Sequence, residues 1–470
     1  MMTRRRLFGC SAALAAAASA TKAFASRLPR LGFAPQAAAA ALPKNKILFR
    51  GDPTYEIQRR GATWNARKPN RFPSAIVLAE NAGDVIAAVK LARERGWQVT
   101  TRSGGHSFTG SHTRDNAVMI NIARMQELSV DPAARIATVS PAVAGDQLNK
   151  ALAGYQLMFP SAHDPGVGLG GFVLCGGHGL NSRLWGPGCA NLQALDVVTA
   201  DGELIHADEK QNSDYLWAAR GSGPGFFGAA VRFYLNVHPL PASRKSSVYI
   251  FSPDALDEVA TWLGHTQNSF PRFLEGLLIG GTADGKPALT LAANSLGPSE
   301  KEVDEALDIL EGAPVVKKAL ARHVKIPFAT GGAIPAGSRQ ILDGVWTSAP
   351  PERILAAGRD AFLTFPTPQS FMLWMHWGPV RKLPDMAYSV QGDVYLSPNA
   401  IYHDAADDER CAAWSAEMIG KLKAIGKGSQ MNDENMPVNR GPYLSTEASA
   451  RLEAMRAKYD PQRRFASFLT

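Results

Sequence analysis

Cysteine is scarce in this chain of 470 residues, which contains only Cys10, Cys175, Cys189 and Cys411. No two of them form a Cys-x-x-Cys pair, so the sequence predicts no zinc or iron–sulfur site and no other metal centre. Cys10 falls in a predicted leader, which leaves three thiols in the mature chain. One disulfide (Cys175–Cys189, or either with Cys411) and buried free thiols are both compatible with that number.

Long apolar runs are missing as well. Beyond the leader no stretch reaches the roughly 20 residues that a membrane-spanning helix needs. The formal net charge is +8, and it falls to about +4 if Arg4, Arg5, Arg6 and Lys22 leave with the leader. The other basic residues are scattered, without a basic helix or interleaved aromatic residues. We therefore expect a small-molecule substrate as partner, no nucleic acid, and no membrane association after export.

Residues 1–25 predict a signal peptide of the twin-arginine type. Thr3–Phe8 supplies adjacent arginines ahead of a short alanine-rich apolar run, and a small-residue cleavage site follows at Ala23–Ala25. A disordered basic tail is the alternative. The twin-arginine pattern is similar to one that exports proteins already folded, which suits a protein whose cofactor is installed in the cytoplasm. The expected location is periplasmic or secreted.

The remaining chain alternates strand and helix patterns, which is typical of an α+β protein. One predicted helix spans residues 85–92, with Asn81 or Asp84 as its cap and Gly96 as its end. The glycine-rich loops become sparse beyond about residue 242, where strands such as 371–377 alternate with helices such as 302–310. The predicted divisions are a linker (26–45), a first domain (46–241), a second domain (242–425) and a closing segment (426–470).

Two hexapeptides match the Gly-x-Gly-x-x-Gly dinucleotide fingerprint, Gly166–Gly171 and Gly223–Gly228. A Rossmann turn needs a buried strand before it and a helix after it. The first hexapeptide follows Asp164-Pro165, and the second contains a proline and runs into a predicted strand, so neither has that context. Such glycines still let the backbone approach a flat or charged ligand and direct N–H groups at phosphate.

The most informative segment is Arg102-Ser103-Gly104-Gly105-His106-Ser107, where two glycines at a strand end present one imidazole. A lone histidine is usually structural, but this segment resembles the R-x-G-G-H-S loop of the berberine-bridge-enzyme-like oxidoreductases. These enzymes belong to the vanillyl-alcohol-oxidase (PCMH-type FAD-binding) superfamily. Similar segments follow the family's order, and the middle of the chain matches only weakly. They are Trp64–Arg67, Gly166–Gly171 with Gly176–Gly179, Asp214–Gly221 with Phe227-Gly228, and Lys458–Phe465.

The resemblance implies a two-lobed FAD-binding domain, to which the closing segment returns. A substrate domain would cover the isoalloxazine with an antiparallel sheet that is itself covered by helices. FAD would be attached covalently through its 8α-methyl carbon to His106. The residues expected to bind the cofactor are Arg102, Ser103, Gly104, Gly105, His106, Ser107, Asp164, Gly166, Gly168, Gly170, Gly171, Gly176, Gly228, Val231 and Asn432.

Two departures from the family pattern matter. Some members form a second flavin link from a cysteine before the proline of the second loop, where this chain has Asp164. His106 would therefore be the only covalent anchor. The family also commonly carries Tyr-x-Asn beside the flavin, whereas this chain has Gln430-Met431-Asn432. A phenolic catalytic role is excluded at Gln430.

Flavin oxidation of a CH–OH or CH–NH group requires the donor carbon against flavin N5 and a base for the released proton. The candidates for the base are Tyr402 and His376. His376 lies in a Trp-His-Trp strand that suits a stacking platform for a sugar or aromatic substrate, with ordinary core aromatics as the alternative. Asp164 is expected either near the flavin ring or as a turn cap before Pro165.

The function expected from these features is oxidation of an alcohol, sugar or related specialised metabolite by hydride transfer to FAD, with oxygen as acceptor. Oxygen access would depend on a few side chains such as Val167 or Leu169. An exported flavin-binding protein without turnover is the alternative.

Overall fold

The computed structural model describes residues 42–283, 286–314, 318–326, 337–431, 435, 438–439 and 441–469. The predicted signal peptide, the linker up to residue 41 and Asn432 lie outside the described residues. Within the described part, no helix is long and apolar enough to cross a membrane. The same part contains no group of three or more His, Cys, Asp or Glu residues placed to hold a metal ion.

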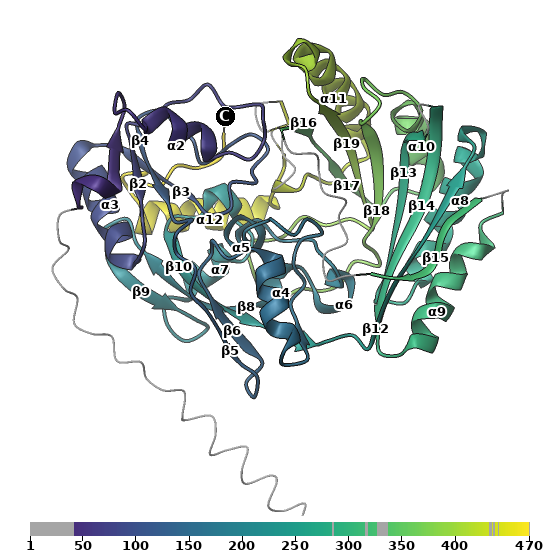
Figure 1. Cartoon of the computed structure of the whole chain (residues 1–470), viewed down its shortest axis with the longest axis horizontal. Coiled ribbons are helices and arrows are strands. Elements are labelled where there is room, and N and C mark those ends of the chain that lie inside the picture. Colours follow the sequence, from purple (N-terminus) through teal and green to yellow (C-terminus); the bar gives the residue numbers. More distant parts are fainter. Residues whose placement is uncertain are drawn as a thin grey trace, which may run out of the picture. The chain divides into compact units, whose positions relative to one another are not determined.

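The N-terminal lobe is built on a four-stranded sheet in the order β1-β2-β4-β3 (Figure 1). Strands β2, β4 and β3 are parallel, and β2 is a run of four buried apolar residues, as expected for a strand covered on both faces. Helix α3 starts at the cap Asn81 and ends at Gly96, whose φ is +67°. The elements are β1 (Ile47–Phe49), α2 (Tyr55–Gly61), β2 (Ala75–Leu78), α3 (Ala82–Arg95), β3 (Gln98–Arg102) and β4 (Ala117–Asn121).

The second lobe contains an antiparallel sheet in the order β5-β6-β10-β8-β9. Helices α4, α5 and α7 contribute to the apolar core on one side of it. Strands β7 (Leu157–Met158) and β11 (His238–Pro239) form a separate pair. The other elements are β5 (Leu128–Asp131), β6 (Ile136–Val139), α4 (Gly145–Ala153), α5 (Leu169–Leu174), α6 (Ser182–Trp185), β8 (Leu192–Val198), β9 (Leu204–Ala207), α7 (Ser213–Ala219) and β10 (Ala229–Asn236).

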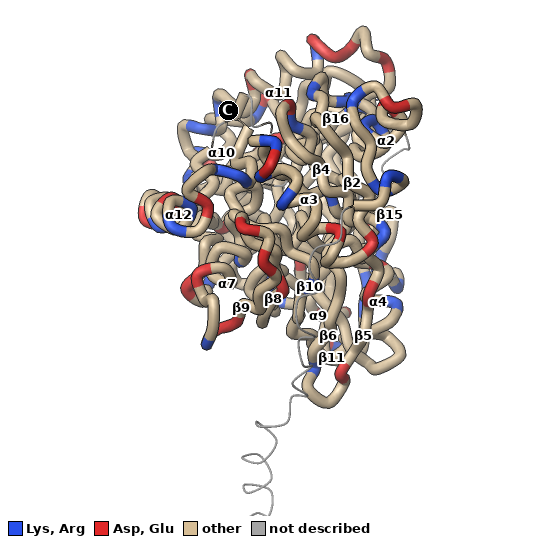
Figure 2. Tube along the Cα trace, turned by 90° about the vertical axis from the view of Figure 1, so that its left-hand side faces the viewer, with Lys and Arg blue, Asp and Glu red and all other residues tan. Residues whose placement is uncertain are grey.

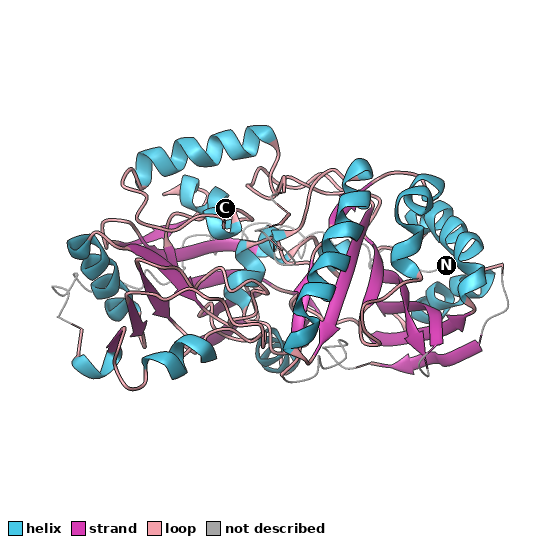
Figure 3. Ribbon diagram, turned by 90° about the horizontal axis from the view of Figure 1, so that it is seen from above, coloured by secondary structure: helices cyan, strands magenta, loops and turns pink. Residues whose placement is uncertain are grey.

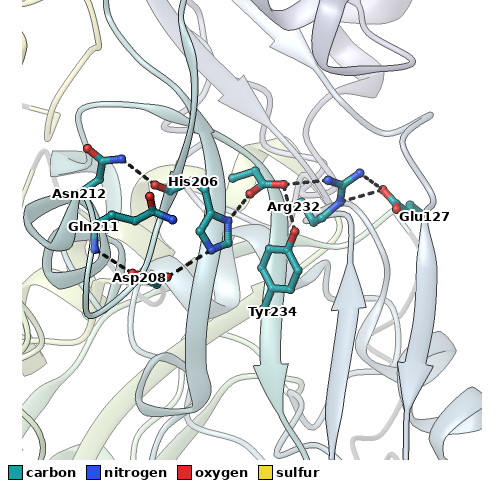
Figure 4. A network of polar contacts seen from close by, with 8 residues as sticks. Glu127, His206, Asp208, Gln211, Asn212, Arg232 and Tyr234 are labelled. Carbon is teal, nitrogen blue, oxygen red and sulfur yellow. Dashed lines mark hydrogen bonds and ion pairs between the residues drawn. The ribbon is translucent and has the colours of Figure 1, made fainter. Parts of the chain in front are cut away.

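A polar network crosses this second sheet (Figure 4). At its centre is the buried carboxylate of Asp196, which accepts hydrogen bonds from Arg232 at 2.8 Å and Tyr234 at 3.2 Å. His206 Nδ1 lies 2.7 Å from the other oxygen of Asp196, and this hydrogen bond raises the pKa of His206. The Arg232 guanidinium also contacts Glu127. The network therefore ties three strands together through one buried charge.

The middle of the chain, from β12 to α11, contains an eight-stranded antiparallel sheet in the order β15-β12-β14-β13-β18-β19-β16, with β17 also paired to β19. Helices α8, α9, α10 and α11 pack on one face and form the domain's core (Figures 1 and 3). This arrangement confirms the expected α+β class and the helix-covered sheet. The elements are β12 (Ser243–Phe251), α8 (Leu256–Thr266), β13 (Leu274–Ala283), β14 (Lys286–Gly297), α9 (Glu300–Asp308), β15 (Lys318–Lys325), β16 (Arg339–Leu342), β17 (Val345–Thr347), α10 (Pro351–Gly358), β18 (Phe371–His376), β19 (Val394–Tyr402) and α11 (Asp408–Leu422).

The C-terminal segment lies against the first lobe. After helix α12 (Thr446–Tyr459), the backbone of Phe465 forms a parallel bridge to Val99 of β3, and the N–H of Ala466 donates to the Val99 carbonyl at 3.0 Å. The buried guanidinium of Arg456 donates to the Phe465 carbonyl at 2.7 Å. These contacts bring the last described residues beside the strand that precedes the His106 loop.

Cys189 and Cys411 are buried free thiols, and Cys175 forms no disulfide with either of them. Of the two alternatives left open by the sequence, the structure therefore contains free thiols. Acidic and basic residues are interspersed over the face drawn in Figure 2.

Candidate active site

A cavity of about 390 Å³ lies where the two glycine loops, the C-terminal segment and the large sheet meet. The first loop contributes residues 102–108, and the second contributes several residues between 162 and 178. Phe465, Ala466 and Ser467 of the C-terminal segment also line it. Segments far apart in the sequence thus share one concave surface.

Arg102 gives the first loop its shape. Its half-buried guanidinium donates to the carbonyls of Ser103 and Gly104, at 2.7 and 3.2 Å. The next carbonyl, of Gly105, accepts from the N–H of Trp64 at 2.9 Å. These three carbonyls thus accept hydrogen bonds from protein groups. The backbone N–H groups of residues 103–107, by contrast, donate to no other described residue. Successive free N–H groups at a cavity fit a phosphate-bearing cofactor.

Gly104 and Gly168 allow the two loops to touch. A Cβ added at Gly104 would lie 2.6 Å from the Gly168 nitrogen, and one added at Gly168 would lie 2.8 Å from the Gly104 Cα. Gly105 has a φ of +76°, which an L side chain rarely adopts. The loops therefore form a cradle of bare backbone that side chains would fill.

His106 lies in this cradle at the cavity wall. Its ring is stacked on Trp64, with 5.3 Å between centroids and 12° between planes. Burial lowers the pKa of His106, and the nearby Asp164 carboxylate opposes this shift. Asp164 Oδ1 also accepts from the Gly166 N–H at 2.8 Å, so Asp164 caps its turn and lies close to His106 at the same time. A neutral imidazole in a fixed plane faces the cavity.

Most of the expected cofactor-binding residues share this cavity. Those that line it are Arg102, Ser103, Gly104, Gly105, His106, Ser107, Asp164, Gly168, Gly170, Gly171 and Gly228. Gly166 lies behind them against the His106 ring, and Gly176 packs on the ring of Tyr388. The side chain of Val231 belongs to the core around the first sheet, whereas its neighbour Ala230 lines the cavity. These residues fit FAD as a group, with Gly166, Gly176 and Val231 outside the lining.

The two candidates for the catalytic base, His376 and Tyr402, do not line the cavity. Leu373 and Met375 of β18 line the cavity, so the alternation of the strand turns His376 to the opposite face, where it is buried against Phe270. Burial there also lowers the pKa of His376 well below its ordinary value. Tyr402 likewise lies in the core under the helices.

Tyr402 is held there by Asp408 of α11, to which its hydroxyl donates at 2.7 Å, and burial raises its pKa. A stacking platform made by Trp374 is excluded for the same reason, because Trp374 is a fully buried member of that core.

The cavity also contains two histidines to which the sequence analysis assigned no role, His163 and His178. His163, in the second loop, places Nε2 2.7 Å from the carboxylate of Glu275 on β13. His178 Nε2 lies 2.7 Å from the Tyr388 hydroxyl, and burial lowers the pKa of His178 to about 3. His163 precedes the noted Asp164, but Glu275 is 112 residues away, so no local pattern pairs the two.

Known proteins that are similar to this chain include FAD-binding oxidoreductases. The model of an FAD binding domain family matches residues 73–208. The FAD-linked oxidoreductase nodO of Hypoxylon pulicicidum is 34% identical over 432 residues, which cover 89% of this chain and 96% of the relative.

Solved structures share the fold over almost the whole chain. The 6-hydroxy-D-nicotine oxidase from Arthrobacter nicotinovorans has a TM-score of 0.78 at 21% identity, covering 91% of this chain and 97% of that one. Physcomitrella patens BBE-like 1 has a TM-score of 0.75 at 19% identity, covering 90% and 96%. The grass pollen allergen Phl p 4, described as having glucose dehydrogenase activity, has a TM-score of 0.77 at 17% identity, covering 91% and 97%.

Proposed function

This chain belongs to the FAD-linked oxidoreductases of the berberine-bridge-enzyme-like, PCMH-type family, and we propose that it oxidises a C–H bond beside an oxygen or nitrogen atom while FAD is bonded to His106. FAD supplies the two-electron acceptor for this chemistry. The observation that carries the proposal is His106 itself, a half-buried imidazole stacked on Trp64 at the wall of a cavity whose loop amides donate to no other described residue.

The state of His106 supports a covalent bond. An imidazole must offer a free nitrogen lone pair to bond to the flavin methyl carbon, and burial favours that neutral form by lowering the pKa of His106. Stacking on Trp64 holds the plane of the ring. Asp164, which occupies the position of the second link in some relatives, is a carboxylate that caps a turn and forms no thioether. His106 would thus be the sole anchor.

The cavity also favours one kind of substrate. The sheet wall opposite the loops carries Leu373, Met375 and the ring of Tyr395, so the part of the substrate that lies on the sheet would be apolar. An alcohol or related specialised metabolite with an apolar skeleton fits this wall better than a sugar, whose hydroxyl groups would lose water without gaining partners on Leu373 and Met375.

Molecular oxygen as the electron acceptor and export by the signal peptide of residues 1–25 complete the proposal. Val167 lines the cavity, as a residue that controls oxygen access should. Anaerobic reduction followed by exposure to air distinguishes the alternatives, because rapid reoxidation with peroxide identifies an oxidase. Export is tested by locating the protein in cells with the leader intact and with Arg4 and Arg5 replaced by lysine.

The decisive experiment is acid precipitation of the purified protein followed by a visible spectrum of the redissolved pellet. A wild-type pellet that stays yellow, with a colourless His106→Ala pellet, is the expected result. His265→Ala serves as the matched control, because His265 is exposed on α8 and pairs with Glu352 far from the loops. Free FAD in the wild-type supernatant would disprove the covalent link.

A further inference from the structure

We propose that His163, positioned by Glu275, is the base that accepts the proton from the substrate's O–H or N–H group. The inference rests on the proposed function, since it names the group that completes the oxidation. The redox step balances with FAD as the oxidant. The substrate C–H bond breaks and its hydrogen leaves with two electrons for the flavin, while the O–H or N–H proton passes to His163. The electron pair of that O–H or N–H bond forms the new C=O or C=N bond.

The location of His163 allows it to meet both substrate and cofactor. It lines the same cavity as His106 and belongs to the loop that also carries Asp164. It faces the sheet wall, where Glu275 lies two residues before Leu277 on the cavity-facing side of β13. His163 Nε2 and Glu275 Oε1 are 2.7 Å apart, a hydrogen bond that joins the cofactor loop to the substrate domain.

Glu275 is suited to hold an imidazolium. Its side chain is 10% exposed, against 28% for His163. The buried cation Arg183 lines a small crevice together with Glu275 and Arg272. In the described structure the Arg183 guanidinium donates only to backbone carbonyls, such as Gly378 at 2.6 Å. Glu275 is therefore a carboxylate that lies close enough to compensate this buried charge.

An ionised carboxylate on one ring nitrogen fixes the orientation of the imidazole and stabilises the protonated ring. Removing Glu275 should therefore weaken His163 as a base without removing the base itself.

The other histidines and carboxylates at the cavity do not fill this role. His106 is committed to the cofactor. Burial lowers the pKa of both His112 and His178 to about 3, so neither can hold a transferred proton near neutral pH. Asp164 is engaged as the cap of its turn. Gln430, which lines the cavity where relatives carry tyrosine, has no basic group.

The charges around His163 set the expected pH dependence. Glu275 in direct contact and Asp164 next to it in the chain both favour the imidazolium. Arg183 and Arg272, behind Glu275, oppose it, and His178 nearby is neutral. A base must be unprotonated, so the rate of substrate oxidation should fall as the pH falls through the pKa of His163.

The test uses the holoenzyme and anaerobic stopped-flow reduction of the flavin from pH 5 to 9. The probes are benzyl alcohol, 1-phenylethanol, cyclohexanol, glucose and benzylamine. His163→Gln, whose amide can still donate to Glu275, should lower the reduction rate by roughly 10²- to 10⁴-fold and abolish the acidic limb of the profile. Glu275→Gln should cause a smaller loss and move that limb to lower pH. Added imidazole should partly rescue His163→Ala but leave His163→Gln unaffected.

A readout without substrate covers the case in which no probe reacts. The visible spectrum of the bound flavin, titrated over the same pH range, should show one transition in the wild type. That transition should be absent in His163→Gln and displaced in Glu275→Gln. His265→Gln is the control and should match the wild type in every measurement.

Two results would overturn the assignment. The first is that His163→Gln reduces its flavin at a rate within about threefold of the wild type and with the same pH profile. The second applies if no probe reacts, and is that the wild type and His163→Gln give identical flavin titrations. The acid-precipitated pellet is recorded for every variant. A colourless wild-type pellet would reject the covalent flavin, whereas a yellow pellet with unchanged His163→Gln behaviour would reject only the role of His163.

Discussion

Substituting Gly104 by alanine tests the contact between the two glycine loops. The added Cβ would lie 2.6 Å from the Gly168 nitrogen and 2.9 Å from its Cα, whereas an ordinary contact begins at 3.4 Å. Both neighbours are backbone atoms, so no rotamer change relieves the overlap. Gly168 cannot withdraw easily, because Leu169 and Gly170 donate to the carbonyls of Val143 and Pro141 at 2.9 and 2.7 Å.

The loops must therefore separate by about 0.8 Å, the difference between these contact distances. Overpacking of this kind costs about 1–3 kcal/mol. This strain should weaken the non-covalent binding of FAD that precedes the bond to His106 by roughly 5- to 150-fold, since about 1.4 kcal/mol corresponds to a factor of ten. We expect a lower flavin content per chain and a fall of a few degrees in Tm.

The assay compares the ratio of absorbance at the flavin band to that of the protein, together with thermal unfolding, for the wild type and Gly104→Ala. Gly61→Ala is the matched control, because a Cβ at the end of α2 would meet no atom within 4 Å. Full flavin content and an unchanged Tm in Gly104→Ala would refute the reasoning that the loops touch through bare backbone.

Three further predictions concern regions outside the cradle. Arg456→Met removes the donor to two buried carbonyls, those of Gly225 and of Phe465 in the C-terminal segment. The free energy of unfolding, measured by thermal unfolding, should fall by about 1–3 kcal/mol, and the C-terminal segment should become sensitive to carboxypeptidase. The hydrogen bond to Asp196 raises the pKa of His206 in the folded protein. The free energy that this bond adds to folding is therefore fully present below the pKa of His206 in the unfolded chain, and it is lost as the pH rises through the pKa in the folded protein. The Tm difference between wild type and His206→Gln should thus be about 1–2 °C at pH 5.5 and vanish by pH 9; a difference that grows with pH would contradict this. Tyr402→Phe removes the bond to Asp408 and should cost about 1 kcal/mol of stability but leave flavin reduction unchanged, and a large loss of rate would restore Tyr402 as a catalytic candidate.

Local features of the fold follow from short stretches of sequence. The cap at Asn81 and the stop at Gly96 mark the ends of α3, because the side-chain acceptor and the residue with positive φ act within one helical turn. The cradle is similarly local in origin. Gly104, Gly105 and Gly168 were recognisable from the sequence, since only glycine leaves backbone N–H groups open to a ligand at such close approach.

The substrate side of the cavity could not be deduced in this way. Alternation along β18 separates Leu373 and Met375 from Trp374 and His376, but it does not say which set faces the cofactor. Helices α8 to α11 decide that question, because they cover the face of Trp374 and leave the other to the cavity. The sequence alone therefore could not tell that His376 lies away from the cavity.

The amino-acid sequence by itself determined the cofactor class, the cradle and the single histidine in it, because these depend on residues adjacent in the chain. The tertiary structure alone decided which polar groups meet the substrate. His163 and Glu275 become partners only when the second loop packs against β13, 112 residues later. Contacts of that kind depend on how the lobes pack, and no spacing within the chain encodes them.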